Sequence, residues 1–155
     1  MHPTTLLLLI AGCLMLQPLS TDLYLASLPH LGSYFGASPA AVQQTLSLFV
    51  IGFGSAQLVS GPLSDRYGRR PVLLGGLGIY VLASIACGLA PTLPILVASR
   101  LVQAIGCCTA VVVARAIIRD AYPPTEGARM IAKASSLLSL APLLGPIAGS
   151  YLQVS

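Results

Sequence analysis

The stretch Gly61–Leu73, GPLSDRYGRRPVL, decides how this sequence folds. It contains four of the chain's twelve charged side chains, and it lies between two long apolar runs. Apolar runs of this length are able to span a bilayer, whereas ionised side chains are costly inside the hydrocarbon. The charged residues are therefore expected in water at a membrane face, in a short turn between two spanning helices. They are Asp65, Arg66, Arg69 and Arg70.

The order of residues in this stretch predicts the shape of the turn. Gly61 and Pro62 are expected to end the first helix, and Gly68 permits a tight reversal because glycine tolerates positive φ. Pro71 suits the first turn of the next helix, where its missing N–H costs nothing. From charge alone, a plain solvated connector on an arginine-rich cytoplasmic side explains the stretch equally well.

Composition indicates an integral membrane protein. Of the 155 residues, 55% are hydrophobic and 8% are charged, whereas a soluble globular domain has about 25% charged residues. The net charge of +4 does not indicate nucleic-acid binding, because Lys and Arg form no continuous stripe. Four cysteines lie in apolar runs without His or acid at ligand spacing, so neither a metal site nor a disulfide framework is expected. They are Cys13, Cys87, Cys107 and Cys108.

The apolar runs predict an all-α membrane protein with five transmembrane helices. Seven of the eight Lys and Arg residues lie in or beside two links on one side, which predicts that this side and the N-terminus are cytoplasmic. A signal peptide is the alternative for the first run, but the residues before it lack Lys and Arg and the run continues past Cys13. The expected spans are 4–28, 39–61, 72–90, 93–114 and 130–154.

Two charged residues, Asp22 and Arg100, fall well inside these spans. Burying either one costs at least about 2.5 to 3.5 kcal/mol on insertion scales, so the cost needs an offset. Gln103 lies one helical turn after Arg100 and shares its face. If the first helix ends near Leu28 and the fourth begins near Pro94, Asp22 and Arg100 both lie roughly 9 Å below the outer surface. Equal depth would permit contact between them.

Four segments carry a resemblance to a known family. Pro18–Tyr24 (PLSTDLY), Arg100–Gly106 and Gly145–Gly149 (GPIAG) resemble the first-, fourth- and fifth-helix motifs of Bcr/CflA-type drug:proton antiporters. The charged stretch fits, at every specified position, the loop signature of the wider group, the major facilitator superfamily. The matching residues are Gly61, Leu63, Ser64, Asp65, Arg66, Gly68, Arg69, Arg70 and Leu73.

The resemblance implies that residues 1–155 are a partial N-terminal transmembrane bundle, five helices of a six-helix bundle that works with a missing C-terminal bundle. It implies a proton-coupled multidrug efflux transporter of the bacterial inner membrane, of the bicyclomycin- and chloramphenicol-resistance type. Its partners would be a small-molecule drug, protons and the lipid bilayer. No nucleic acid and no cofactor are expected, because the proton gradient supplies the energy.

The buried charges and the charged turn predict roles for individual residues. Asp22 is expected to exchange its proton against drug, with Arg100 and Gln103 tuning the exchange. A static pair, or two charges that each find water separately, is the alternative. A conformational latch at the cytoplasmic rim is expected to comprise Gly61, Asp65, Arg66, Gly68, Arg69 and Arg70.

The fifth-helix antiporter motif is expected to act by close packing. Gly145 and Gly149 share a helix face, which lets a neighbouring helix approach, and Pro146 lies between them. An ordinary packing groove with no bearing on coupling is the alternative.

Other functions remain open at this point. A major facilitator uptake carrier for a small metabolite shares the loop signature, and a truncated, non-transporting membrane fragment is a further alternative. An enzyme is not expected, because the sequence has no Ser/His/acid, paired-carboxylate or phosphate-loop arrangement, and His2 and His30 are isolated. The identity of the drug does not follow from the sequence.

Overall fold

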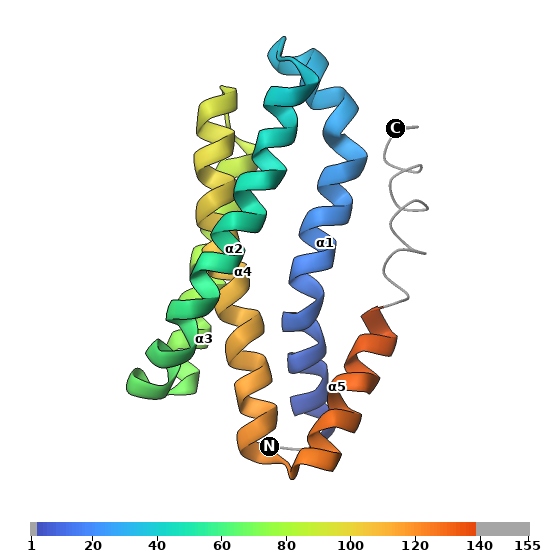
Figure 1. The fold of residues 1–155 in the computed structure, drawn as a ribbon, viewed down its shortest axis with the longest axis vertical. Coiled ribbons are helices and arrows are strands. Elements are labelled where there is room, and N and C mark those ends of the chain that lie inside the picture. Colours follow the sequence, from blue (N-terminus) through green and yellow to red (C-terminus); the bar gives the residue numbers. More distant parts are fainter. Residues whose placement is uncertain (1–2, 139–155) are drawn as a thin grey trace. The chain divides into compact units, whose positions relative to one another are not determined.

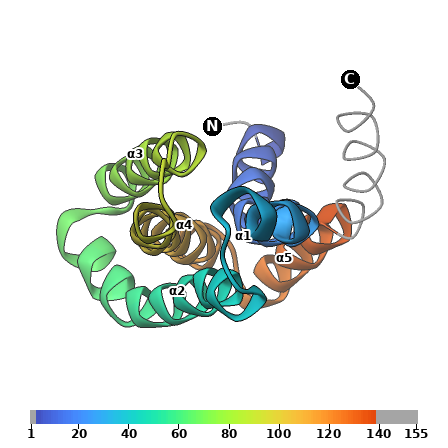
Figure 2. The same ribbon diagram turned by 90° about the horizontal axis from the view of Figure 1, so that it is seen from above.

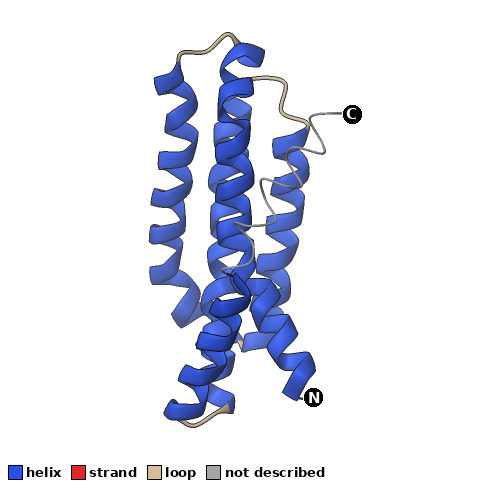
Figure 3. Ribbon diagram, turned by 90° about the vertical axis from the view of Figure 1, so that its right-hand side faces the viewer, coloured by secondary structure: helices blue, strands red, loops and turns tan. Residues whose placement is uncertain are grey.

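A computed structural model describes residues 3–138 of the chain. These residues form helices joined by short links and contain no strand (Figure 3). The predicted all-α fold is therefore confirmed. The helices, shown in Figure 1, are α1 (Pro3–Phe35), α2 (Pro39–Tyr67), α3 (Arg69–Gly88), α4 (Leu93–Ala121) and α5 (Pro124–Leu138).

Three of the described helices, α2, α3 and α4, are long and apolar enough to cross a membrane. In α1, the strongly apolar part is the shorter stretch Leu8–Asp22. The first span, predicted at 4–28, lies within a longer helix, and its limits stay a prediction. Most of the predicted fifth span, 130–154, lies outside the described residues, and α5 covers only its start.

The predicted end of α2 is wrong. Gly61 and Pro62 lie inside this helix, which continues to Tyr67. The missing N–H of a proline removes one backbone hydrogen bond, but two other hydrogen bonds stabilise the turn that follows Pro62. The Ser64 hydroxyl donates to the Gly61 carbonyl at 2.8 Å, and the Gly68 N–H donates to the Ser64 carbonyl at 3.1 Å. The reversal comes at Gly68, which has φ 93° and ψ 153°.

The start of α3 follows the prediction. Gly68 is its N-cap residue, and Pro71 lies in its first turn. The first-turn N–H groups of a helix have no partner within the helix, so a proline there costs no hydrogen bond. Gly68 and Pro71 together make the α2–α3 turn as short as the sequence predicted.

Two other helix ends differ from the expected span limits. Helix α1 continues past Leu28 to Phe35, where Gly36, with φ 57°, and a bond from the Ala37 N–H to the Gly32 carbonyl at 3.1 Å end it. Helix α4 continues past Ala114, so most of the predicted charged loop is helical. Hydropathy reports the part of a helix that a bilayer covers, whereas backbone hydrogen bonding continues into water.

The chain divides into two compact units. One is Ser27–Val113, which holds α2, α3 and most of α4. The described residues of the other unit are 3–26 and 114–138. Within the first unit, α2, α3 and α4 pack beside one another, as the view along the helices shows (Figure 2). The antiparallel arrangement predicted from the short links is present in this unit.

Helix α2 buries a single stripe of side chains at spacings of three or four residues. Its opposite face is apolar and exposed: Leu58 is 80% exposed, and Val59 lies beside it. A water-soluble helix shows the reverse pattern, with polar residues outside, so this face suits lipid. The buried stripe is Val42, Thr45, Phe49, Gly52, Ala56, Ser60 and Ser64.

Helices α3 and α4 approach each other closely at two glycines. A Cβ built on Gly106 of α4 would lie 2.6 Å from the backbone nitrogen of Tyr80 and 2.8 Å from the carbonyl oxygen of Gly76, both in α3. A Cβ on Gly76 would lie 2.8 Å from the Thr109 side chain. Glycine is required at both positions because the helix backbones themselves meet there, and small residues allow this approach in membranes.

We predict that Gly106→Ala destabilises the protein, because its methyl group would overlap the α3 backbone. Overpacking of this kind costs about 1–3 kcal/mol. The matched control is Gly75→Ala in α3, where nothing lies within 4 Å of the added carbon, and a change of about 1 kcal/mol or less is expected. Denaturant unfolding of the purified protein in detergent measures both. Equal stability of the two variants would contradict the close approach.

Candidate functional site

A chain of polar side chains lies inside the Ser27–Val113 unit, between α4 and α3. The Arg100 guanidinium donates from Nη1 to Oε1 of Gln103 at 2.8 Å. The Gln103 amide donates in turn from Nε2 to the Ser84 hydroxyl at 2.7 Å, and Ser84 donates to the Tyr80 carbonyl at 2.7 Å. The prediction that Arg100 and Gln103 share a face is confirmed, and α3 supplies the next member of the chain.

Arg100 is buried, with 9% of its surface exposed. Its Cζ atom lies 5.9 Å from the centre of the Phe49 ring on α2, within the range of a cation–π contact. Aromatic and amide partners reduce the cost of keeping a guanidinium in an apolar helix. Side chains of α2 and α4 thus contact the charge directly, and α3 contacts it through Gln103.

A second polar contact joins α2 to α4 in the same unit. The hydroxyl oxygens of Ser60 and Thr109 lie 3.0 Å apart, and both residues are buried. Thr109 also donates to the Ile105 carbonyl at 2.8 Å. When Thr109 uses its proton in this way, Ser60 is the donor of the bond between the helices. Such a bond fixes the register of α2 on α4, since a slip of one residue would break it.

Four residues that the sequence motifs do not indicate also belong to the site: Ser84, Phe49, Ser60 and Thr109. A signal was present for Ser84, since it is one of the few polar residues in the apolar part of α3. Hydroxyl groups in membrane helices often bond their own backbone, however, as Ser55 does to the Ile51 carbonyl. The partner on another helix depends on the register between helices, which a single sequence does not contain.

Asp22 lies in the other compact unit, and its side chain is exposed. Its contact with Arg100 therefore stays a prediction. The expected equal depth was counted from an α1 end near Leu28, whereas α1 continues to Phe35. The relative depth of Asp22 and Arg100 therefore also stays a prediction.

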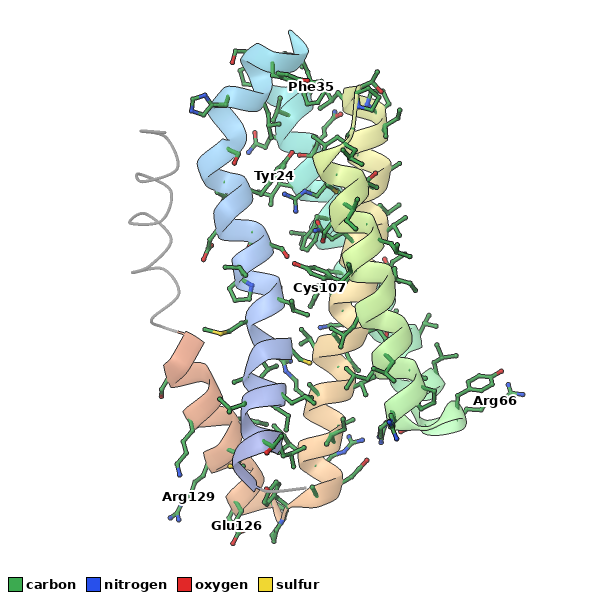
Figure 4. All side chains as sticks on the ribbon, turned by 180° about the vertical axis from the view of Figure 1, so that it is seen from behind. Tyr24, Phe35, Arg66, Cys107, Glu126 and Arg129 are labelled. Atoms are coloured by element: carbon green, nitrogen blue, oxygen red, sulfur yellow. The ribbon has the colours of Figure 1, made fainter. Side chains whose placement is uncertain are left out.

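The predicted latch residues lie at the α2–α3 turn. Arg69 contacts Asp65 at 2.6 Å and donates from Nη1 to the buried Ser64 hydroxyl at 2.5 Å. The Arg66 guanidinium lies over the Tyr67 ring at 5.4 Å from its centre, and Figure 4 shows Arg66 at the tip of the turn. Asp65, Arg66 and Arg69 are thus gathered at one end of the unit.

Gly61 lies in α2 with nothing within 4 Å of a built Cβ, so close packing does not require glycine there. Gly145, Pro146 and Gly149 lie outside the described residues. Within residues 3–138, no group of three or more His, Cys, Asp or Glu side chains is placed to hold a metal ion.

Helices with apolar outer faces and buried polar links between them define a multi-pass membrane protein. The chain belongs to the major facilitator superfamily, whose family model matches residues 10–154. This is a family of transporters, so the prediction that the chain is not an enzyme is confirmed.

The proteins to which this chain is similar in sequence include transporters and drug-resistance proteins. The chain is 36% identical to a chloramphenicol resistance protein of Pseudomonas aeruginosa, over 90% of this chain and 34% of that protein. It is 39% identical to an uncharacterized transporter of Rickettsia bellii, over 88% of this chain and 34% of that protein. It is 31% identical to the multidrug resistance protein MdtL of Escherichia coli O81, over 91% of this chain and 36% of that protein. The chain spans about a third of the length of these relatives.

We predict that Gly68→Ala destabilises the α2–α3 turn, because φ of 93° is strained for a residue with a side chain. Strain of this kind costs about 1–3 kcal/mol. Gly61→Ala is the matched control, since Gly61 is helical and has open space around it; it is expected to stabilise by up to about 1 kcal/mol. Unfolding in detergent measures both. A larger cost for Gly61→Ala would contradict this account of the turn.

Proposed function

We propose that this chain is the N-terminal part of a proton-coupled exporter of small, mostly apolar drugs. Two of the relatives are named for resistance to chloramphenicol or to multiple drugs, and each matches at least 90% of the chain. The observation that carries the proposal is the burial of Arg100 within an apolar helix. A charge in such a place is costly, and in membrane proteins it marks a substrate, ion or proton pathway.

Arg100 supports proton coupling because its guanidinium stays charged at every physiological pH. Its field favours the ionised form of a carboxyl group that comes near, and it releases that group toward protonation when the two move apart. Asp22 is the proposed proton carrier, as the acid at the end of the apolar stretch of α1. Gln103 tunes the exchange through its bond to Arg100.

The proposal includes a second helix bundle that the chain works with. Transporters of this architecture bind substrate near the bilayer midplane, between two bundles that rock against each other. The chain spans about a third of the relatives' length, which supports a complete transporter longer than residues 1–155. We place it in the bacterial inner membrane with the N-terminus in the cytoplasm, following the distribution of Lys and Arg. The proton gradient supplies the energy, and no cofactor is needed.

We also propose that the α2–α3 turn acts as a conformational latch. Its charged residues lie at one end of the Ser27–Val113 unit, whereas the Arg100 network lies nearer the other end, close to the start of α4 and the end of α3. The Asp65 side chain is 59% exposed, so it is accessible to a partner in another conformation of the transporter. A residue with this role affects the rate of transport more than the binding of drug.

We predict that Asp22→Asn reduces proton-driven export in the full-length transporter to background, because the amide cannot bind or release a proton at physiological pH. Insertion and accumulation of the protein should be unchanged. The measurement is drug export from proteoliposomes under an imposed pH gradient. Asp120→Asn, which changes an exposed carboxylate near the end of α4, is the control and should export normally. Full pH-driven export by Asp22→Asn would remove Asp22 from the mechanism.

We predict that Asp65→Asn slows export from the full-length transporter. Drug binding to the solubilised transporter should stay within about twofold, because an exposed pair at i,i+4 contributes only about 0.3–0.5 kcal/mol to the stability of the fold. Asp65→Glu retains the carboxylate and should restore most of the export rate. Binding by calorimetry and export by proteoliposomes separate the two effects. An equal loss of binding would place Asp65 at the substrate site and end the latch proposal.

A further inference from the structure

Three helices of the Ser27–Val113 unit meet at one level, at Ser60 in α2, Gly76 in α3 and Thr109 in α4. The hydroxyl oxygens of Ser60 and Thr109 lie 3.0 Å apart, and both residues are buried. A Cβ built on Gly76 would lie 2.8 Å from the Thr109 side chain, so α3 also touches Thr109. A buried hydrogen bond beside such a close approach leaves the helices little room to shift. We call these three residues the junction.

The α2–α3 turn extends beyond the junction as residues 61–75, which we call the tip. Side chains of the tip join its two helices to each other. The Ser64 hydroxyl of α2 donates to the Gly61 carbonyl at 2.8 Å and accepts from Nη1 of Arg69 at 2.5 Å. The Arg69 guanidinium, at the start of α3, also pairs with Asp65 of α2 at 2.6 Å. These bonds link the last turn of α2 to the first turn of α3.

The α2 part of the tip has a weak point immediately after the junction. Pro62 lies inside the helix, and a proline has no N–H to donate to the Leu58 carbonyl. The residue before it, Gly61, has nothing within 4 Å of a built Cβ. Prolines inside helices are the usual places where helices bend. Helix α2 is therefore easiest to bend just beyond Ser60, which the junction holds.

The α3 part of the tip has a weak point at the same level. Gly75 directly precedes Gly76 of the junction, and glycine restricts the backbone less than any other residue. Nothing lies within 4 Å of a Cβ built on Gly75. Packing does not require glycine there, in contrast to Gly76, where the Thr109 side chain does. Both helices of the tip thus have a flexible residue next to the junction.

We propose that the tip turns as one body about a hinge with two parts, Gly61–Pro62 in α2 and Gly75 in α3, while the junction stays fixed. This rotation moves the exposed side chains of Asp65 and Arg66 relative to the rest of the unit. It leaves the helices on the other side of the junction in place. The effect on transport rests on the proposed function, whereas the motion itself does not.

Two substitutions in the full-length transporter stiffen the hinge. Pro62→Ala restores the backbone donor in α2, and Gly75→Ala restricts the α3 backbone at a position with room for the methyl group. Pro39→Ala is the control for the proline, because Pro39 lies in the first turn of α2, where a proline costs no hydrogen bond. Gly78→Ala is the control for the glycine, because Gly78 has equal space but lies on the other side of the junction.

The first readout is hydrogen–deuterium exchange of the tip amides, measured by mass spectrometry on the purified protein in detergent. Each variant is compared with the wild type at the same residues, so that protection by detergent cancels. Pro62→Ala should slow exchange about tenfold, and Gly75→Ala about threefold, in both the α2 and the α3 part of the tip. The two controls should stay within about twofold of the wild type.

Two outcomes of this measurement would overturn the proposal. Slower exchange confined to the substituted helix would show that the tip does not move as one body. Unchanged exchange in both Pro62→Ala and Gly75→Ala would show that these residues are not a hinge.

The second readout is export from proteoliposomes under a pH gradient. Pro62→Ala should lower the maximal export rate about fivefold and leave the half-saturating drug concentration within about twofold, whereas Pro39→Ala should export at the wild-type rate. Slower amide exchange with an unchanged export rate would overturn the role of the hinge in transport. If the wild type exports no drug, the proposed function fails, and the exchange data alone then decide whether the tip is hinged.

Discussion

A guanidinium that cannot lose its charge lies buried in α4, and the rest of the Ser27–Val113 unit is arranged around that cost. Buried carboxyl, imidazole or amine groups can become neutral, whereas arginine must find partners instead. Arg100 finds an amide on its own helix and an aromatic ring on α2. Because the amide depends on α3, one charge ties three helices together. The buried charge of Arg100 is thus stabilised only when these helices keep their positions.

These contacts require helices that approach closely, and in a bilayer no hydrophobic force brings helices together. The approach depends on dispersion, which acts only at contact distance. Gly106 and Gly76 let α3 and α4 meet at the backbone, and a Cβ on Gly52 would lie 2.6 Å from the Leu101 side chain of α4. The glycines let these helices come into contact, and the hydrogen bonds of the hydroxyl and amide side chains then fix the register between them.

Sequence and structure agree where a feature is local. The helical fold, the shared face of Arg100 and Gln103, and the places of Gly68 and Pro71 all follow from spacing, charge and backbone freedom within a few residues. The predicted end of α2 at Gly61 and Pro62 is wrong, because hydrogen bonds around Ser64 continue the helix beyond the proline. Partners on other helices depend on register, which one sequence does not determine.

The ion pair at the α2–α3 turn is too weak to drive a conformational change by itself. The Asp65–Arg69 pair is exposed on its acidic side, and pairs of this kind contribute about 0.3–0.5 kcal/mol, which changes an equilibrium only about twofold. Arg69 also binds the Ser64 hydroxyl, which fixes the shape of the turn. A ligand or contact shifts a conformational equilibrium only through interactions that differ between the two states. The energy for switching must therefore come from a contact that these charges make in one transport state alone.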